Sequence, residues 1–207
     1  MGTWELVEHL KEIIPIANKW VFQKRYNQIG KIMKYKARLV AKGRAQCPGF
    51  DYNETYSSIV WLETIRAILA LVPIYDPKIN QMDIKGAYLN RYLSEQVYMK
   101  QPEEYEDKTG HICHLKKTLY RLKQAGHKWN KEFNRKIHTK DFHQLKSDPC
   151  AYIWRNYQDL SIITIWVDDL LSFTNLDEEK AHTKKDSESM EIWAKLLGLK
   201  FHQGKIL

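Results

Sequence analysis

Cysteine is scarce in this sequence, since its 207 residues include only Cys47, Cys113 and Cys150. Three scattered cysteines are too few for a disulfide framework, so we expect reduced thiols. The run from His111 to His114 has no second ligand pair at zinc-finger spacing, which favours a core cysteine at Cys113 over a metal site. The sequence shows no signal peptide, no apolar stretch of about 18 residues, no internal repeat and no low-complexity linker. These absences predict an intracellular, cytoplasmic protein that is neither secreted nor membrane-spanning.

Acidic residues are missing from Lys19 to Arg44, a stretch that contains nine basic residues. A second stretch, His114 to Lys146, has ten basic residues against two acidic ones. Together these stretches hold 19 of the 33 Lys and Arg residues of a chain whose formal net charge is +8. The excess favours a polyanionic partner such as nucleic acid, although a charge run by itself is as often only a solvated face.

Two alternating stretches near the N-terminus predict a β-hairpin, with strands at residues 18–24 and about 32–42 and a turn at residues 27–30. Because successive side chains of a strand alternate, one face of the second strand carries Lys34, Lys36, Arg38 and Lys42. The opposite face carries Tyr35, Ala37, Leu39 and Ala41. The basic face could grip a triphosphate or a template backbone, or could simply be the wet side of an exposed ribbon.

The rest of the chain mixes helical and strand patterns. An apolar stripe predicts a core helix that ends at Pro73, and a second helix is expected around Trp129, Phe133 and Ile137. Short strands are expected from about residue 78 to Asp83 and, as an antiparallel meander, at residues 150–154, 160–167 and 170–174. A last helix, from about residue 177 to 197, would cover the sheet. Helices and antiparallel strands in this order predict an α+β fold.

The pair Asp168–Asp169 stands between two apolar, β-branched runs and is expected at the turn of a hairpin. Two adjacent carboxylates repel each other, so they are retained at low cost if they are solvated or gathered around a cation. Mg²⁺ is the natural candidate because it prefers hard oxygen ligands. An ordinary Asp-Asp turn is the alternative, and Asp83 at a strand end could equally be a helix cap.

Six separate blocks carry a family resemblance that covers nearly the whole chain. In order they are Thr3–Val7, Lys19–Phe22, Tyr35–Gly43, Gln81–Lys85, Tyr98–Pro102 and Ser147–Cys150. In their order and spacing these blocks resemble the reverse transcriptase domain of copia-type retrotransposons. Six ordered blocks are far more specific than any one motif, and they favour a functional role for Asp168–Asp169.

The resemblance implies an RNA-directed DNA polymerase with the fingers and palm of a right-hand polymerase. The fingers would take residues 1–75 and 92–128, and the palm residues 76–91 and 129–207, within a single domain fragment that lacks a thumb. The palm carboxylates, which are both the catalytic residues and the metal ligands, would be Asp83, Asp168 and Asp169. The expected nucleotide-binding residues are Lys36, Arg38, Tyr88 and Gln124.

The same resemblance implies two Mg²⁺ ions, which Mn²⁺ could replace, and dNTPs as substrates. It implies an RNA or DNA template with a primer as the nucleic-acid partner. The remaining polyprotein domains, namely thumb, RNase H and integrase, are expected as partners outside this chain. A retroelement particle is then an alternative location to the open cytoplasm, and no membrane partner is expected.

Four departures from the family pattern put local features in question. Trp166 stands where the family has Tyr before Val-Asp-Asp, Arg91 and Arg121 stand where it has Gly, and Gly126-His127 replaces Pro-Arg. Arg121 and Gly126 flank Gln124, so the backbone beside the nucleotide site is expected to change. A non-catalytic nucleic-acid-binding remnant of a decayed element is therefore the alternative function.

Overall fold

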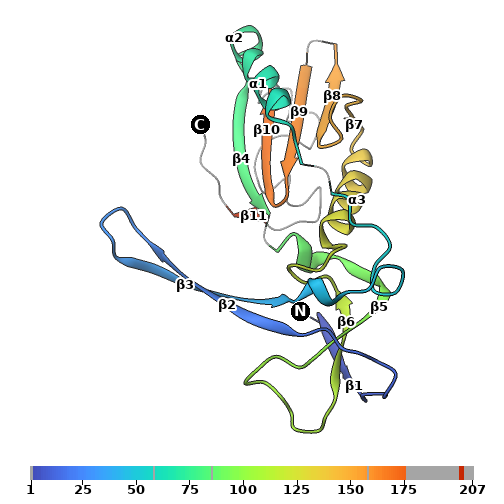
Figure 1. The fold of residues 1–207 in the computed structure, drawn as a ribbon. Coiled ribbons are helices and arrows are strands. Elements are labelled where there is room, and N and C mark those ends of the chain that lie inside the picture. Colours follow the sequence, from blue (N-terminus) through green and yellow to red (C-terminus); the bar gives the residue numbers. More distant parts are fainter. Residues whose placement is uncertain (1, 58, 85, 158, 176–200, 203–207) are drawn as a thin grey trace. The chain divides into compact units, whose positions relative to one another are not determined.

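The computed structural model describes residues 2–57, 59–84, 86–157, 159–175 and 201–202 (Figure 1). The chain forms two compact units. Unit 1 combines Met1–Tyr56 with Tyr88–Lys128, and unit 2 combines Ser57–Ala87 with Trp129–Leu207. The expected boundary between fingers and palm after residue 128 coincides with a boundary between the two units. The two divisions differ elsewhere: the expected one assigns residues 57–75 to the fingers, whereas they lie in unit 2, and residues 88–91 to the palm, whereas they lie in unit 1. That division stays a prediction.

Unit 1 contains two small antiparallel sheets (Figure 1). One has three strands in the order β1 (Trp4–Val7), β6 (Ile112–Lys117), β5 (Tyr92–Met99). The other is a ribbon of β2 (Asn18–Tyr26) and β3 (Ile32–Ala41). Two short 3-10 helices, η1 (Gly43–Ala45) and η2 (Tyr88–Asn90), follow β3 and precede β5. The ribbon confirms the predicted hairpin and its turn at residues 27–30.

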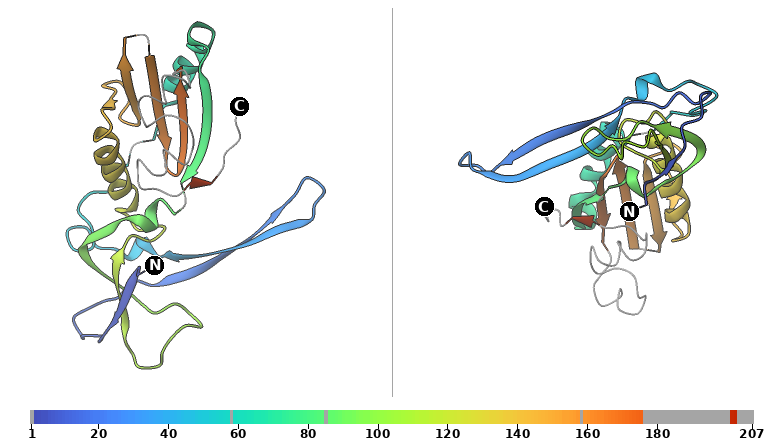
Figure 2. Two further views of the ribbon diagram at one scale, coloured as in Figure 1. Left: turned by 180° about the vertical axis from the view of Figure 1, so that it is seen from behind. Right: turned by 90° about the horizontal axis from the view of Figure 1, so that it is seen from below.

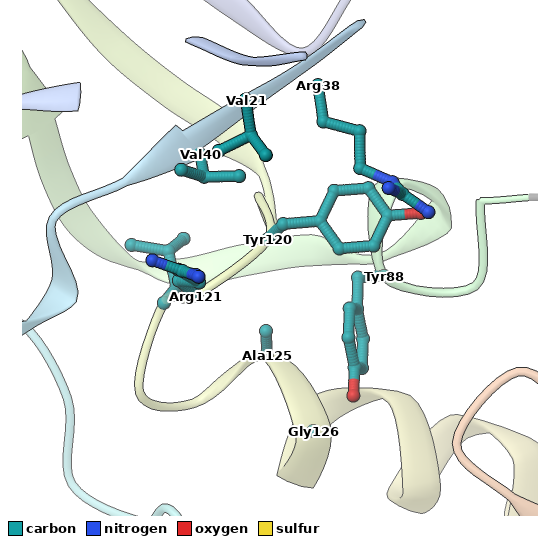
Figure 3. Close-up of a pocket in the computed structure, with 9 residues that line it drawn as sticks. Val21, Arg38, Val40, Tyr88, Tyr120, Arg121, Ala125 and Gly126 are labelled. Atoms are coloured by element: carbon teal, nitrogen blue, oxygen red, sulfur yellow. The ribbon is translucent and has the colours of Figure 1, made fainter. Parts of the chain in front are cut away.

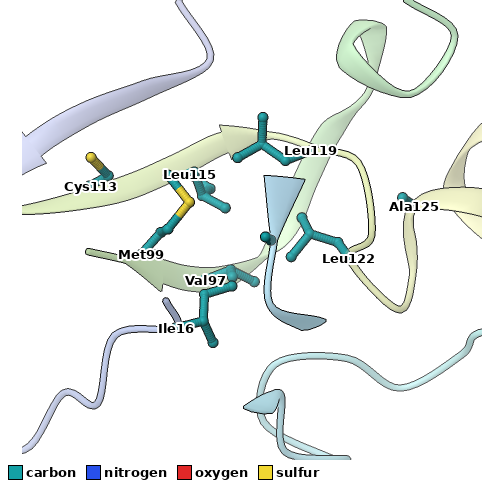
Figure 4. Packing of buried hydrophobic residues seen from close by; sticks show 9 residues of the cluster. Ile16, Val97, Met99, Cys113, Leu115, Leu119, Leu122 and Ala125 are labelled. Atoms are coloured by element: carbon teal, nitrogen blue, oxygen red, sulfur yellow. The ribbon is translucent and has the colours of Figure 1, made fainter. Parts of the chain in front are cut away.

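The core of unit 1 lies where β5 and β6 meet the segments around them (Figure 4). Val97, Met99 and Cys113 are fully buried there, and Ile16, Leu119 and Leu122 pack beside them. Burial raises the pKa of the Cys113 thiol to about 11, and the nearby negative charge of Asp107 contributes. Cys113 is thus a reduced core residue, as expected, and all three cysteines are free thiols.

Unit 2 is built on a six-stranded antiparallel sheet in the order β11-β4-β10-β9-β8-β7 (Figure 2). Its strands are β4 (Lys78–Ile84), β7 (His143–Gln144), β8 (Ala151–Asn156), β9 (Asp159–Trp166), β10 (Asp169–Thr174) and β11 (Phe201–His202). Strands β8, β9 and β10 confirm the predicted meander, and the unit as a whole confirms the α+β class. The helix expected at residues 177–197 lies outside the described residues.

Helices pack on both faces of this sheet. On one face Ile68, from α1 (Leu62–Ala70), packs with Ile162 and Phe173, which lie directly opposite each other in β9 and β10. On the other face α3 (Ala125–His138) inserts its predicted apolar stripe, in which Trp129, Phe133 and Ile137 are at most 2% exposed. The Phe133 ring lies 5.6 Å from that of Tyr152 in β8. Together the two helices bury both surfaces of the central strands.

The prediction for Pro73 was wrong. The helix α1 already ends at Ala70, and Pro73 stands inside a second short helix, α2 (Val72–Tyr75). Proline is tolerated in the first turn of a helix, where its missing N–H would have no partner in any case. The expected core stripe is also narrower than predicted, because Leu69 is 46% exposed whereas Ile68 is 5% exposed. No helix among the described residues is both long and apolar enough to cross a membrane.

Candidate functional site

Three side chains form a row across neighbouring strands of unit 2. Asp83 in β4 is directly opposite Asp169 in β10, and Asp169 is in turn directly opposite Trp166 in β9. Directly paired residues of antiparallel strands project from the same face of the sheet. The sheet register therefore brings together Asp83 and Asp169, which are far apart in the sequence.

Asp168 lies beside this row, in the tight turn that joins β9 to β10. The turn residues are Val167 and Asp168, whereas the sequence predicted Asp168 and Asp169. Asp169 instead begins β10 and takes part in the ladder. The apolar pattern could not distinguish these registers, because Val167 resembles a strand residue although it occupies the turn.

The backbone of this turn is unusual and is held from two sides. Val167 has φ +58°, a left-handed conformation that β-branched residues rarely adopt. Its carbonyl accepts a hydrogen bond of 2.6 Å from the indole Nε1 of Trp129 in α3. The next carbonyl, that of Asp168, accepts one of 2.7 Å from the backbone N–H of Ile84 in β4. A helix and a neighbouring strand thus fix the segment that carries Asp168.

The three carboxylates influence one another electrostatically. The pKa of Asp169 is raised, first by partial burial and then by the negative charges of Asp168 and Asp83. A divalent cation would relieve this repulsion, and carboxylate oxygens are ligands that Mg²⁺ prefers. Among the described residues, no three or more His, Cys, Asp or Glu side chains are arranged to hold a metal as they stand. Mg²⁺ usually takes only one or two protein carboxylates and completes its shell with water and phosphates, so the donor set fits this ion.

The two-residue period of a continuous strand would place Trp166 on the same face as Asp168. The chain turns at Val167 and Asp168, so that period stops before it reaches Asp168. Trp166 instead lies opposite Asp169, with 47% of its surface exposed. Its indole therefore stands on the carboxylate face of the sheet.

Unit 1 contains a separate cavity of about 440 Å³ (Figure 3). It is lined by Val21, Arg38, Val40, Tyr88, Tyr120, Arg121, Leu122, Ala125 and Gly126. The rings of Tyr88 and Tyr120 meet edge to face at 5.6 Å, and the Arg38 guanidinium lies 5.7 Å from the centre of the Tyr120 ring. The cavity thus combines two arginines, two phenol rings and the first residues of α3.

The four predicted nucleotide-binding residues have different surroundings. Arg38 and Tyr88 line the cavity. Lys36 lies two residues before Arg38 in β3 and shares its face of the ribbon. Gln124 does not line the cavity: it is 1% exposed, accepts a hydrogen bond from Gln46 and donates one to the carbonyl of Asp51. Its amide joins three segments of unit 1, a role that the sequence did not suggest.

Sequence patterns did not indicate the roles of Trp129, Tyr120 and Asp148. Trp129 was assigned only to the core, because an apolar stripe does not show where an indole N–H points. Tyr120 stands in a basic run without a motif of its own. Asp148, which belongs to the last of the six family blocks, is buried and accepts hydrogen bonds of 2.8 Å from the backbone N–H groups of Trp61 and Cys150. It therefore ties the segment before α1 to the segment before β8.

The ribbon of unit 1 has two chemically different faces. Trp20, Phe22 and Tyr35 lie on one face, where the rings of Trp20 and Phe22 stack at 6.3 Å. Phe22 is 75% exposed and Tyr35 is 70% exposed. The other face carries Lys19, Arg25, Lys34, Lys36 and Arg38. Exposed rings can stack on bases and cations can contact phosphates, so the ribbon suits single-stranded nucleic acid.

Comparisons with known proteins agree with the resemblance noted in the sequence. The sequence model of one protein family, described as reverse transcriptase (RNA-dependent DNA polymerase), matches residues 1–205. The chain is 39% identical over 173 residues to the retrovirus-related Pol polyprotein from transposon TNT 1-94 of Nicotiana tabacum, covering 82% of this chain. It is 35% identical over 196 residues, or 93% of this chain, to the Pol polyprotein from transposon RE1 of Arabidopsis thaliana. The matched region is 13% of the length of each of these two relatives.

Proposed function

The chain belongs to the reverse transcriptase (RNA-dependent DNA polymerase) family, and from this we propose that it extends a primer 3′-hydroxyl with dNTPs on an RNA or DNA template. It is the reverse transcriptase region of a retrotransposon Pol polyprotein. The observation that supports catalysis best is the pairing of Asp83 with Asp169 across two strands, with Asp168 in the adjoining turn. Unit 2 would then contain the palm, and unit 1 the fingers.

The proposed reaction is attack of the primer 3′-oxygen on the α-phosphorus of a dNTP, with release of pyrophosphate. When bound, Mg²⁺ would stabilise the negative charge on the attacking and leaving oxygens. The role of Asp83, Asp168 and Asp169 is to hold such cations and to orient the reacting groups. Because the hydrogen bonds from Trp129 and Ile84 fix the turn, the backbone that carries Asp168 needs little rearrangement when substrate binds.

The cavity of unit 1 supports the nucleotide part of this proposal. Arg38 presents a permanently charged guanidinium, which suits phosphate oxygens. Tyr88 presents a rigid ring beside it, and in this proposal the ring would exclude a ribose 2′-hydroxyl and so favour dNTPs. Lys36, on the same face of β3 as Arg38, would add a second charge for the phosphates. Gln124 would support the nucleotide site indirectly, through the three backbone segments that its amide joins. Alternatively, it would contact the nucleotide directly after a rearrangement.

Primer extension on an RNA template, with Mg²⁺ or Mn²⁺, tests the proposal. We expect the wild type to extend the primer and Asp168→Asn to lose the activity, because the amide replaces an anionic ligand by a neutral one. Asp141→Asn is the matched control: Asp141 is an exposed carboxylate in a turn of unit 2, with φ +62°, a conformation that Asn tolerates. Extension that survives Asp168→Asn would refute the catalytic assignment.

The ribbon supports a second candidate, a nucleic-acid-binding protein that no longer catalyses. Binding of a single-stranded oligonucleotide should weaken steeply with salt, and Lys34→Ala should lower the salt slope by about 1. Phe22→Ala should weaken binding by about 1–3 kcal/mol per stacked base. Phe50→Ala is the control, because Phe50 is 87% exposed but lies outside the ribbon. Binding with these properties but without primer extension would favour the second candidate.

Partners beyond this region are proposals as well. The Pol polyproteins that the chain matches are much longer, and the matched region is 13% of each. We propose that thumb, RNase H and integrase regions accompany this chain in its polyprotein, and that it acts in the cytoplasm or in a retroelement particle.

A further inference from the structure

Arg121 adopts a backbone conformation that an arginine rarely takes. Its φ is +68°, in the left-handed region, which is strained for a residue with a Cβ but not for glycine. The surrounding backbone maintains this conformation. A Cβ added to Gly43 would lie 2.1 Å from the Arg121 carbonyl oxygen, so these two segments are in close contact. Arg121 is therefore held in a strained position by its neighbours.

The side chain of Arg121 lines the cavity of unit 1, together with that of Arg38 (Figure 3). Among the described residues, neither guanidinium has a hydrogen-bond or ion-pair partner; Arg38 has only its contact with the Tyr120 ring. Two unneutralised guanidinium groups that face one cavity repel each other. An anion that bound between them would turn this repulsion into attraction.

We propose that Arg121 is a second phosphate-binding arginine, and that it acts with Arg38 to bind the triphosphate group of a nucleotide in this cavity. The identity of the ligand as a nucleotide rests on the proposed function, whereas the polyphosphate chemistry rests on the cavity itself. A volume of about 440 Å³ lies within the range of small-molecule sites, and the two tyrosine rings provide flat surfaces beside the cations.

The position of its side chain distinguishes Arg121 from an ordinary surface arginine, because Arg121 lines the cavity together with Arg38. A left-handed backbone alone does not, since the exposed Lys108 also has φ +61°. Strain is, however, often retained where a side chain must point at a ligand. Glycine at this position would remove both the strain and the charge. Stability and anion binding should then change in opposite directions.

The test measures inorganic tripolyphosphate binding by calorimetry, and thermal stability, for the wild type and two glycine variants. Arg121→Gly should raise the melting temperature and weaken tripolyphosphate binding by about 10-fold. Lys108→Gly is the matched control, because it removes one exposed cation at φ +61° in unit 1 but does not line the cavity. It should gain similar stability and bind tripolyphosphate like the wild type. Arg121→Lys should bind more weakly than the wild type but more tightly than Arg121→Gly.

Three outcomes would overturn the inference: no tripolyphosphate binding by the wild type, unchanged binding by Arg121→Gly, or an equal loss in Lys108→Gly. A single-stranded oligonucleotide tests the alternative anion. If Arg121→Gly weakens oligonucleotide binding but not tripolyphosphate binding, the residue contacts a nucleic-acid backbone and the inference fails. Primer extension by the wild type is measured separately. Its absence, with Arg121-dependent tripolyphosphate binding intact, would refute the polymerase proposal and leave the phosphate site standing.

Discussion

Removal of the hydrogen bond from Trp129 should damage catalysis more than it damages folding. In Trp129→Phe the buried position keeps an aromatic ring, but the N–H that donates to the Val167 carbonyl at 2.6 Å is lost. A buried carbonyl left without its partner costs about 1–3 kcal/mol. The space left by the smaller ring adds a cavity term, for a total of roughly 2–4 kcal/mol. Domains are stable by about 5–15 kcal/mol, so the variant should remain folded at 25 °C.

The turn itself determines the catalytic effect. Val167 stays at φ +58° only while its surroundings hold it, so loss of the indole bond frees the turn to relax toward an ordinary conformation. A displacement near 1 Å at the reacting groups can cost on the order of 100-fold in rate. We therefore expect kcat for primer extension to fall about 10- to 100-fold, with KM for dNTP changed less than about 3-fold.

Two further variants separate positioning from general destabilisation. Trp61→Phe is the matched control, since Trp61 is 56% exposed and only its backbone N–H bonds to Asp148. It should keep wild-type kcat. Val167→Gly, added to Trp129→Phe, should restore part of the lost rate because glycine adopts the left-handed conformation without strain. If kcat of Trp129→Phe stays within about twofold of wild type at a temperature where both are folded, the positioning argument is wrong.

Three other changes give separate expectations. Asp169→Asn should abolish primer extension yet raise the melting temperature slightly at pH 7, since the raised pKa of Asp169 means that its charged form destabilises the folded state. That gain should vanish below about pH 3.5, where the carboxyl is protonated in folded and unfolded chains alike; a lower melting temperature at pH 7 would contradict it. Gly43→Ala should destabilise unit 1 by about 1–3 kcal/mol, because the new Cβ would meet the Arg121 carbonyl oxygen at 2.1 Å, and denaturant unfolding equal to wild type would disprove that contact. Trp166→Tyr should raise primer extension, since a smaller ring on the Asp169 face leaves more room for a primer end, whereas equal or lower activity would remove the steric argument.

Local patterns in the sequence were enough to predict the ribbon, the buried side of α3, the strands of the meander and the candidate carboxylates. The alternation of apolar and polar side chains over residues 18–24 and 32–42 predicted the ribbon. Successive side chains of a strand point to opposite faces, so two faces with different surroundings leave a two-residue pattern in the local sequence. The stripe at Trp129, Phe133 and Ile137 predicted the buried side of α3 for the same reason. Asp83 at a strand end and the Asp168–Asp169 pair were visible as carboxylates next to apolar runs, and the ordered blocks indicated the family.

Long-range packing sets which of these residues lie next to each other, and the sequence pattern does not show it. The register that sets Asp83 opposite Asp169 depends on packing between strands far apart in the chain, and local pattern carries no information about it. The turn consists of Val167 and Asp168, and not of Asp168 and Asp169, because hydrogen bonds from α3 and β4 stabilise the left-handed conformation of Val167, which valine rarely adopts. Hydrogen bonds to distant segments of unit 1 bury the Gln124 side chain. Close contact with the segment of Gly43 holds the backbone of Arg121, whose side chain lines the cavity. Such contacts override local preference because each adds burial or a hydrogen bond that the isolated segment cannot form.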